Sequence, residues 1–151
     1  MQKLSRLIAT VFYLGYFPII PGTIASLLGL VLFILLKGNL IGLSVLTGLV
    51  LLLGFYSAGP AERFLQKKDA QVIVIDELSG MLLCFVFLPQ AKITLLNSFL
   101  IFLVFRIFDW TKPYPIRNLQ NLRGSLGIML DDILAALYTN IIFQVFLRLV
   151  S

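Results

Sequence analysis

The sequence predicts an all-α fold, a small polytopic helical bundle embedded in a membrane, and three observations support this prediction. Of the 151 residues, 60% are hydrophobic and only 13% are charged, whereas soluble domains are about 45–50% apolar and about 25% charged. The mean hydropathy is high, at +1.01. The apolar residues also gather in long runs with few charges, as in integral membrane proteins. This length predicts a single membrane-embedded domain over residues 1–151, the alternative being a soluble helical protein with an unusually large core.

The chain begins with a segment, residues 2–14, that predicts an amphipathic helix lying along the membrane interface. Its basic residues, Lys3 and Arg6, are interleaved with apolar side chains at helical spacing. A basic and then apolar N-terminus also resembles a signal peptide, but no small-residue cleavage site follows it. We therefore expect this segment to be retained in the protein.

Five apolar runs follow, and each predicts a hydrophobic helix. Several are shorter than the roughly 20 residues that a straight crossing of a bilayer needs. The first run reaches only about 21 Å at about 1.5 Å per residue, so we expect neighbouring residues to extend it or part of it to be re-entrant. The runs are residues 23–36, 40–58, 72–88, 94–108 and 128–150.

The basic residues predict the orientation of these helices. If all five runs cross the membrane, nine Lys and Arg residues fall on one side and three on the other. Because Lys and Arg concentrate in cytoplasmic loops, the richer side and the N-terminus are predicted to be cytoplasmic and the C-terminus outside. The net charge of +5 thus indicates orientation and contact with anionic lipid, and no basic tract interleaved with aromatic residues indicates a nucleic-acid partner. The nine are Lys3, Arg6, Arg63, Lys67, Lys68, Arg106, Lys112, Arg117 and Arg123, and the three are Lys37, Lys92 and Arg148.

All seven carboxylates fall at the predicted inner face, and four of them lie about one turn inside the apolar zone. A carboxylate at the centre of a bilayer costs about 2.5–3.5 kcal/mol, and less near its edge. These acids therefore need a compensating cation. Glu62 and Asp69 lie in the first inner loop, Asp109 follows the fourth run, and the pairs Asp76–Glu77 and Asp131–Asp132 lie inside the third and fifth runs.

A divalent cation bound by oxygen ligands suits these acids. The chain has no histidine and a single cysteine, Cys84, in an apolar run, so His-dependent nucleophilic mechanisms and His ligation of zinc are excluded. Mg²⁺ prefers carboxylates, water and phosphate oxygens. Adjacent helical residues point about 100° apart, so one acid of each pair is expected to face the interior, either Asp76 with Asp132 or Glu77 with Asp131. Ion pairs with inner-loop arginines are the alternative.

The segment between the fourth and fifth runs, residues 109–127, has the composition of a phosphate-binding loop. Two prolines stop the preceding helix, and two glycines permit close approach of a ligand to the backbone at a helix N-terminus. Arginine offers a planar fork for phosphate, and lysine offers a point charge. An ordinary basic loop that contacts lipid headgroups is the alternative. The residues concerned are Asp109, Lys112, Pro113, Pro115, Arg117, Arg123, Gly124 and Gly127.

A second candidate for phosphate binding is PIIPGTIAS, residues 18–26. Pro21-Gly22 is predicted to end one segment, and Thr23 is predicted to be the N-cap of the next helix. The free amides of that helix would then lie at the same inner face as the acids. Ala25 and Gly29 form a pair of small residues four apart, which favours helix packing.

Four segments resemble the bacterial phosphatidylglycerophosphatase A family, in the family's order and over about half of the chain. One departure is Ala70, where the family pattern leads us to expect a proline, and this weakens the case for Asp69 as a ligand. The matching segments are GYFPIIPGTIASLLG (15–29), KDAQVIVIDELSGMLL (68–83), FRIFDWTKPYPIRNLQ (105–120) and GSLGIMLDDILAALY (124–138).

The resemblance implies an activity and a location. Family members remove the terminal phosphate of phosphatidylglycerophosphate, giving phosphatidylglycerol and phosphate, and require Mg²⁺. The implied location is the bacterial cytoplasmic (inner) membrane, with the active site facing the cytoplasm and membrane lipids as partners. Metal-assisted hydrolysis is the expected mechanism, and a covalent aspartyl-phosphate route through Asp109 or Asp131 ranks second.

The resemblance and the residue pattern together lead us to expect specific roles for ten residues. Asp76, Glu77, Asp131 and Asp132 are expected to bind the metal. Asp109, Asp131, Asp132 and Lys112 are the expected catalytic residues, with Asp109 as a further ligand or the general base. Thr23, Arg106, Arg117 and Arg123 are the expected substrate-binding residues.

Two other functions compete with this reading. A small transporter or channel would use Asp76, Glu77 and Asp131 in an ion pathway, but the acids gather at one face and no inverted-repeat pattern is evident. A non-catalytic assembly or lipid-binding protein would account for the basic loops but would leave the paired acids without a role.

Overall fold

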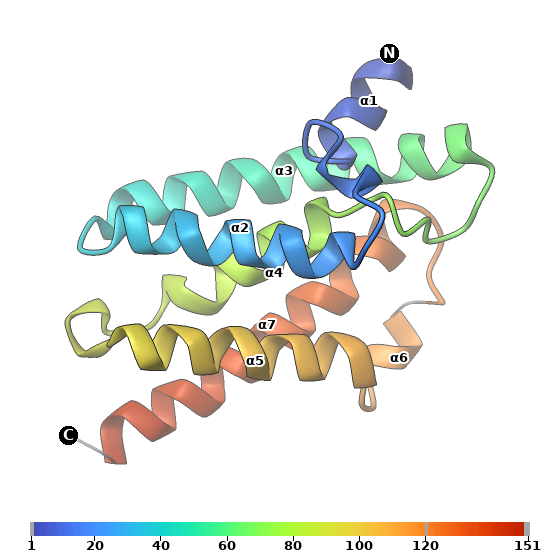
Figure 1. Cartoon of the computed structure of the whole chain (residues 1–151). Helices are drawn as coiled ribbons and strands as arrows, with labels where there is room; N and C mark the ends of the chain where they lie inside the picture. Colours follow the sequence, from blue (N-terminus) through green and yellow to red (C-terminus); the bar gives the residue numbers. More distant parts are fainter. Residues whose placement is uncertain (1, 120, 150–151) are drawn as a thin grey trace.

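The computed structural model describes residues 2–119 and 121–149, and it confirms the all-helical prediction, since these residues contain no β-strand. The two longest helices are connected to shorter ones by brief loops and two 3-10 turns. In chain order the elements are α1 (Gln2–Ala9), η1 (Leu14–Tyr16), α2 (Pro21–Leu36), α3 (Leu40–Leu65), α4 (Ile75–Val86), η2 (Gln90–Lys92), α5 (Leu95–Thr111), α6 (Ile116–Leu119) and α7 (Ser125–Leu149) (Figure 1).

Helix α4 lies in the middle of the bundle and packs against α2, α3 and α7. Successive long helices run back and forth, so that the starts of α2, α4 and α7 and the ends of α3 and α5 lie at one end, with α1 and α6 (Figure 1, right). We call this the site end. The topology therefore gathers the first turns of three helices in one region.

The core holds α2 against α4. The rings of Phe33 and Phe85 stack with their centroids 3.7 Å apart, and both side chains are fully buried. Closer to the site end, a Cβ added at Gly29 would lie 2.9 Å from Cβ of Met81. Ala25 is also fully buried, so the predicted small-residue pair does serve helix packing. This close approach sets how deeply the start of α2 reaches beside the start of α4.

Two described helices are long and apolar enough to cross a membrane. They are α3, with 26 residues, and α7, with 25 residues. Helix α2 is apolar but has 16 residues, α5 has 17, and α4 has 12, which is about 18 Å at about 1.5 Å per residue. The expectation of about five hydrophobic spanning helices is therefore not confirmed.

Several predicted boundaries are wrong. Thr23 is not an N-cap: Ile20 occupies that position and Pro21 follows it, because proline's fixed φ suits the first helical position. The stretch 59–71 is not all loop, since α3 continues to Leu65 with Pro60 inside it. The last helix begins at Ser125, before the apolar run that predicted it.

The N-terminal helix is shorter than expected. It ends at Ala9, and Val11, Phe12 and Tyr13 have positive φ angles of 47°, 53° and 68°. The N–H of Val74, just before α4, donates to the carbonyl of Ala9 at 3.0 Å. This contact between distant segments ties the end of α1 to the approach to α4, and periodicity alone does not predict it.

Candidate active site

Three carboxylates meet at the site end. Asp76 and Glu77 come from the first turn of α4, and Asp132 comes from α7. Each offers one oxygen, and the three oxygens lie within 4.8 Å of one another. We call these three residues the acid cluster. Asp76 and Asp132 are 8% and 2% exposed, so the cluster lies within the protein.

Both acids of the α4 pair join this cluster, which corrects the expectation that only one would face the interior. They occupy the first turn of α4. Side chains in a helix point back toward its N-terminus, so first-turn side chains reach beyond the helix end. There, two residues about 100° apart around the axis can still converge on one point.

One oxygen of each carboxylate in the cluster is buried without a hydrogen-bond partner among the residues that the structure describes. Asp76 Oδ1, Glu77 Oε2 and Asp132 Oδ2 are buried, and none accepts a hydrogen bond within the described part of the chain. A buried charged oxygen without a partner is costly, and three of them at one place repel one another. The donor set fits a hard divalent cation, which would satisfy all three oxygens at once.

The start of α2 closes one side of the cluster. Gly22, in the first turn of α2, has no room for a side chain, because a Cβ there would lie 2.0 Å from Oε1 of Glu77. Gly22 was not among the predicted site residues. The Pro-Gly dipeptide is the signal for it, once the proline is placed at the first helical position.

Asp131 has a different role from its neighbour. Its Oδ2 accepts a hydrogen bond from Nζ of Lys112 at 2.5 Å, and its Oδ1 accepts the N–H of Asp132 at 3.1 Å. Burial lowers the pKa of the Lys112 amine, but the Asp131 carboxylate outweighs burial and raises this pKa above its ordinary value. Lys112 therefore remains a cation beside the acid cluster, and whether Asp131 binds metal stays a prediction.

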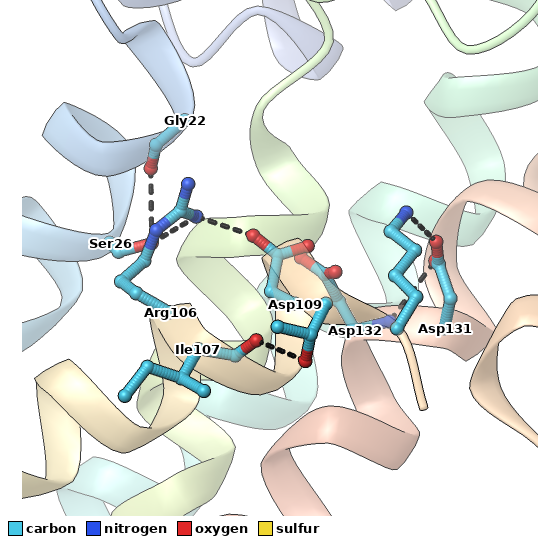
Figure 2. A network of polar contacts seen from close by, with 9 residues as sticks. Gly22, Ser26, Arg106, Ile107, Asp109, Asp131 and Asp132 are labelled. Carbon is cyan, nitrogen blue, oxygen red and sulfur yellow. Dashed lines mark hydrogen bonds and ion pairs between the residues drawn. The ribbon is translucent and has the colours of Figure 1, made fainter. Parts of the chain in front are cut away.

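A second ion pair lies within α5, and its arginine also reaches α2. Arg106 Nη1 lies 2.7 Å from Asp109 Oδ2 and donates to Ser26 Oγ at 3.2 Å, while Ser26 Oγ donates to the Gly22 carbonyl at 3.0 Å. Figure 2 shows Asp109 between Arg106 and Asp132. The pair of Arg106 and Asp109 therefore adjoins the acid cluster (Figure 2). Sequence reasoning missed Ser26, and no pattern around it marks it.

The four residues expected to bind substrate are divided between two cavities and the surface. Thr23 and Arg106 line a groove between α2 and α5 of about 460 Å³. Arg123 lines a larger cavity of about 800 Å³ between α3 and the start of α7, with Arg63, Lys67 and Lys68. Arg117 is exposed on α6. Within residues 2–119 and 121–149, neither Arg117 nor Arg123 forms an ion pair with the acid cluster.

Comparison with known proteins identifies a family. The sequence profile described as Phosphatidylglycerophosphatase A matches residues 7–147. Two bacterial proteins named phosphatidylglycerophosphatase A are similar to this chain. The one from Haemophilus influenzae is 34% identical over 91% of this chain and 85% of its own length. The one from Escherichia coli is 35% identical over 89% of this chain and 78% of its own length.

A third relative has a different substrate in its name. A Bacteroides thetaiotaomicron protein, provisionally named a phosphatidylinositol-3-phosphatase, is 32% identical over 94% of this chain and 92% of its own length. All three relatives are named as phosphatases, and none as a transporter or channel. No solved structure matches the chain. The chain belongs to the phosphatidylglycerophosphatase A family of phosphatases.

Proposed function

We propose that this protein is a Mg²⁺-dependent lipid phosphatase that hydrolyses the terminal phosphate of phosphatidylglycerophosphate. The observation that carries this proposal is the acid cluster, in which three buried carboxylate oxygens lack partners in a chain of this family. Water is consumed, the bond between the terminal phosphorus and the glycerol oxygen breaks, and that oxygen takes a proton. The products are phosphatidylglycerol and inorganic phosphate.

The acid cluster would hold the metal. Its ligands would come from Asp76, Glu77 and Asp132, because their carboxylate oxygens lie within 4.8 Å of one another and Mg²⁺ prefers oxygen ligands. When bound, the metal supplies Lewis-acid stabilisation of the phosphate oxygens.

The remaining polar residues position charge and protons around the phosphate. Lys112, kept cationic by Asp131, would stabilise negative charge that develops on the transferring group. Asp109, which lies 2.7 Å from Arg106, would accept a proton from the attacking water. Asp131 would orient Lys112, since its Oδ2 accepts from Lys112 Nζ while its Oδ1 accepts the backbone N–H of Asp132.

The surface suits a protein embedded in a membrane, with the site end at the cytoplasmic face of the inner membrane. Large apolar side chains are exposed along the long helices, including Leu35 at 74%, Ile41 at 79% and Leu52 at 69%. Burying such side chains in lipid removes them from water. Basic residues at the site end favour the cytoplasmic side. The substrate's acyl chains would then lie in the same leaflet as the acid cluster.

Phosphate release from purified protein tests the proposal. Protein in detergent micelles is expected to release phosphate from phosphatidylglycerophosphate when Mg²⁺ is present and to stop when a chelator removes it. Activity should return when Mg²⁺ is added back in excess. A protein that releases no phosphate from this lipid at any Mg²⁺ concentration, while correctly folded, would refute the function.

A further inference from the structure

We propose that the groove between α2 and α5 admits the substrate sideways from the bilayer and that Arg106 binds its phosphodiester. This inference rests on the proposed function and adds the orientation of the substrate. The terminal phosphate would lie at the acid cluster, the phosphodiester at Arg106, and the diacylglycerol along the groove. Arg106 would thereby select lipids that carry both phosphate groups.

The groove has the character of a lipid-binding surface. Its volume is about 460 Å³, and its polar lining comes from Thr23 and Arg106. The apolar lining is open to the surroundings, with Ile20 at 62% exposed, Ile107 at 56% and Trp110 at 87%. A chain of methylene groups fits such a lining, and Arg106 places a positive charge beside it.

Arg106 connects this groove to the acid cluster. Its side chain lines the groove and is 22% exposed, while its Nη1 contacts Asp109, whose side chain is 12% exposed. Figure 2 shows Arg106 reaching from α5 toward Ser26 on one side and Asp109 on the other. A ligand in the groove would meet the guanidinium before it meets the acids. The remaining guanidinium N–H groups can donate to a phosphate oxygen.

The substrates named for the relatives have the chemistry that this placement requires. Phosphatidylglycerophosphate and phosphatidylinositol 3-phosphate both carry a phosphodiester next to the diacylglycerol and a phosphomonoester farther out on the polyol. Phosphatidate has only a phosphomonoester, attached directly to the diacylglycerol. A protein that binds the diester at Arg106 therefore discriminates against phosphatidate, because phosphatidate cannot occupy both positions.

The larger basic cavity between α3 and α7 is the competing location for the diester. Its cations Arg63, Lys67, Lys68 and Arg123 are exposed. Within the described ranges none of them forms an ion pair with the acids of the cluster. Glu62 also lines that cavity. The α2–α5 groove is favoured because the side chain of Arg106 both lines it and contacts Asp109 beside the acid cluster.

A fluorescence experiment tests binding without requiring catalysis. Trp110 is the one tryptophan of the sequence, so its emission reports on the groove. In detergent micelles, a lipid with brominated acyl chains and a non-hydrolysable phosphonate in place of the terminal phosphate should quench it saturably. Brominated phosphatidylcholine should quench only in proportion to its mole fraction. Equal quenching by the two lipids would overturn the groove as a binding site.

A substrate comparison tests the role of Arg106. Arg106→Lys keeps the charge but removes the fork, and it should lower the kcat/KM ratio of phosphatidylglycerophosphate over phosphatidate roughly 10- to 100-fold, the range for losing a hydrogen bond to a charged group. Arg148 lies in the last turn of α7, at the end of the bundle away from the acid cluster. Arg148→Lys is therefore the matched control and should keep the wild-type ratio. If both variants keep the wild-type kcat/KM ratio, Arg106 does not bind the phosphodiester.

Blocking the groove gives an independent result. Ile107→Trp should raise KM for phosphatidylglycerophosphate roughly tenfold, whereas Leu96→Trp should not. Leu96 is exposed to a similar extent, 66% against 56%, on the same helix but outside the groove. Unchanged KM in Ile107→Trp refutes the groove while leaving the phosphatase function intact. A wild-type protein that releases no phosphate refutes the function itself, and the quenching experiment still reports on binding.

Discussion

At the scale of single residues, partners decide which acids can hold a cation. Asp131 and Asp132 are adjacent, and both are buried. Lys112 and a backbone N–H satisfy Asp131, whereas Asp132 Oδ2 is left without a partner. Two neighbouring residues of the same type therefore differ in whether they have an oxygen free to bind a cation. The difference comes from Lys112, which follows the last residue of α5.

Asp132→Asn should separate activity from stability. Removing one negative charge from the cluster relieves repulsion, so the metal-free variant is expected to unfold at a higher temperature than the metal-free wild type. Phosphate release should fall by about 100-fold or more, in line with losing an essential ligand. Thermal unfolding in detergent, with chelator and with Mg²⁺, and phosphate release measure both effects.

The Mg²⁺ response of the same variant is the sharper readout. A ligand at about 100 times its Kd stabilises the folded state by about 2.7 kcal/mol, so Mg²⁺ should raise the unfolding temperature of the wild type and not of Asp132→Asn. Glu62→Gln is the control, because Glu62 lies outside the cluster and accepts the N–H of Asp69. A normal Mg²⁺ response in Asp132→Asn would rule out this metal site.

Lys112→Met should expose the dependence of Asp131 on its partner. The substitution leaves a buried carboxylate unpaired, and the expected loss is about 1–3 kcal/mol of unfolding free energy, together with activity. Lys112→Met combined with Asp131→Asn should recover stability but not phosphate release. Thermal unfolding of the single and double variants measures this coupling. Independent, additive effects would mean that the 2.5 Å contact has no energetic consequence.

At the scale of elements, the starts of helices determine the site. Helices α2, α4 and α7 all begin at the site end (Figure 1). Pro21 places the start of α2 so that Gly22 reaches Glu77. The turn-containing segment before α4 is tied to α1 through Val74 and Ala9. A shift of one residue at the start of α4 or α7 would turn the acids of that helix away from the cluster.

Gly22→Ala is expected to disrupt the cluster without disrupting the fold. The new methyl group would lie 2.0 Å from Oε1 of Glu77, so the carboxylate must move and Mg²⁺ should bind at least about tenfold more weakly. Gly48→Ala is the matched control, because a Cβ at Gly48 meets no atom within 4 Å. Mg²⁺ titration of phosphate release measures the difference. Equal Mg²⁺ dependence in the two variants would contradict this packing argument.

At the scale of the whole molecule, the proposed membrane would give the two ends of the bundle different surroundings. Helices α3 and α7 are long enough to cross it, while α4 is short and nearly enclosed by α2, α3 and α7. The bundle can therefore carry a short, polar-ended helix at its centre. In the proposed membrane, the longer helices around it would shield its acids from lipid.

Thiol labelling tests the predicted orientation. In a Cys84→Ala background, which removes the one native cysteine, Lys92→Cys lies in η2 and Arg117→Cys in α6, at opposite ends of the bundle. A membrane-impermeant thiol reagent added to intact cells should label Lys92→Cys. It should label Arg117→Cys only after the membrane has been permeabilised. The reverse pattern would place the acid cluster outside and contradict the proposed orientation.

The all-helical class could be read from the sequence because apolar runs and turn residues act locally. The approximate positions of α2, α3, α4, α5 and α7 followed from these runs. The ends did not: α3 continues past Pro60 and α1 stops at Ala9. Those boundaries depend on contacts with other helices, and hydropathy along the chain contains no information about such contacts. The number of membrane crossings could not be predicted for the same reason, because it depends on where each helix begins and ends.

The sequence by itself determined which chemistry is available: carboxylates and cations gathered at one end of an apolar bundle, with no histidine and one buried thiol. Only the tertiary structure decided how these groups are shared. It joined Glu77 to Asp76 and Asp132, paired Asp131 with Lys112, and placed Arg106 between a groove and the cluster. The physical reason is that composition sets the charges, whereas the energy of a charge depends on its distance to other charges, which only packing fixes.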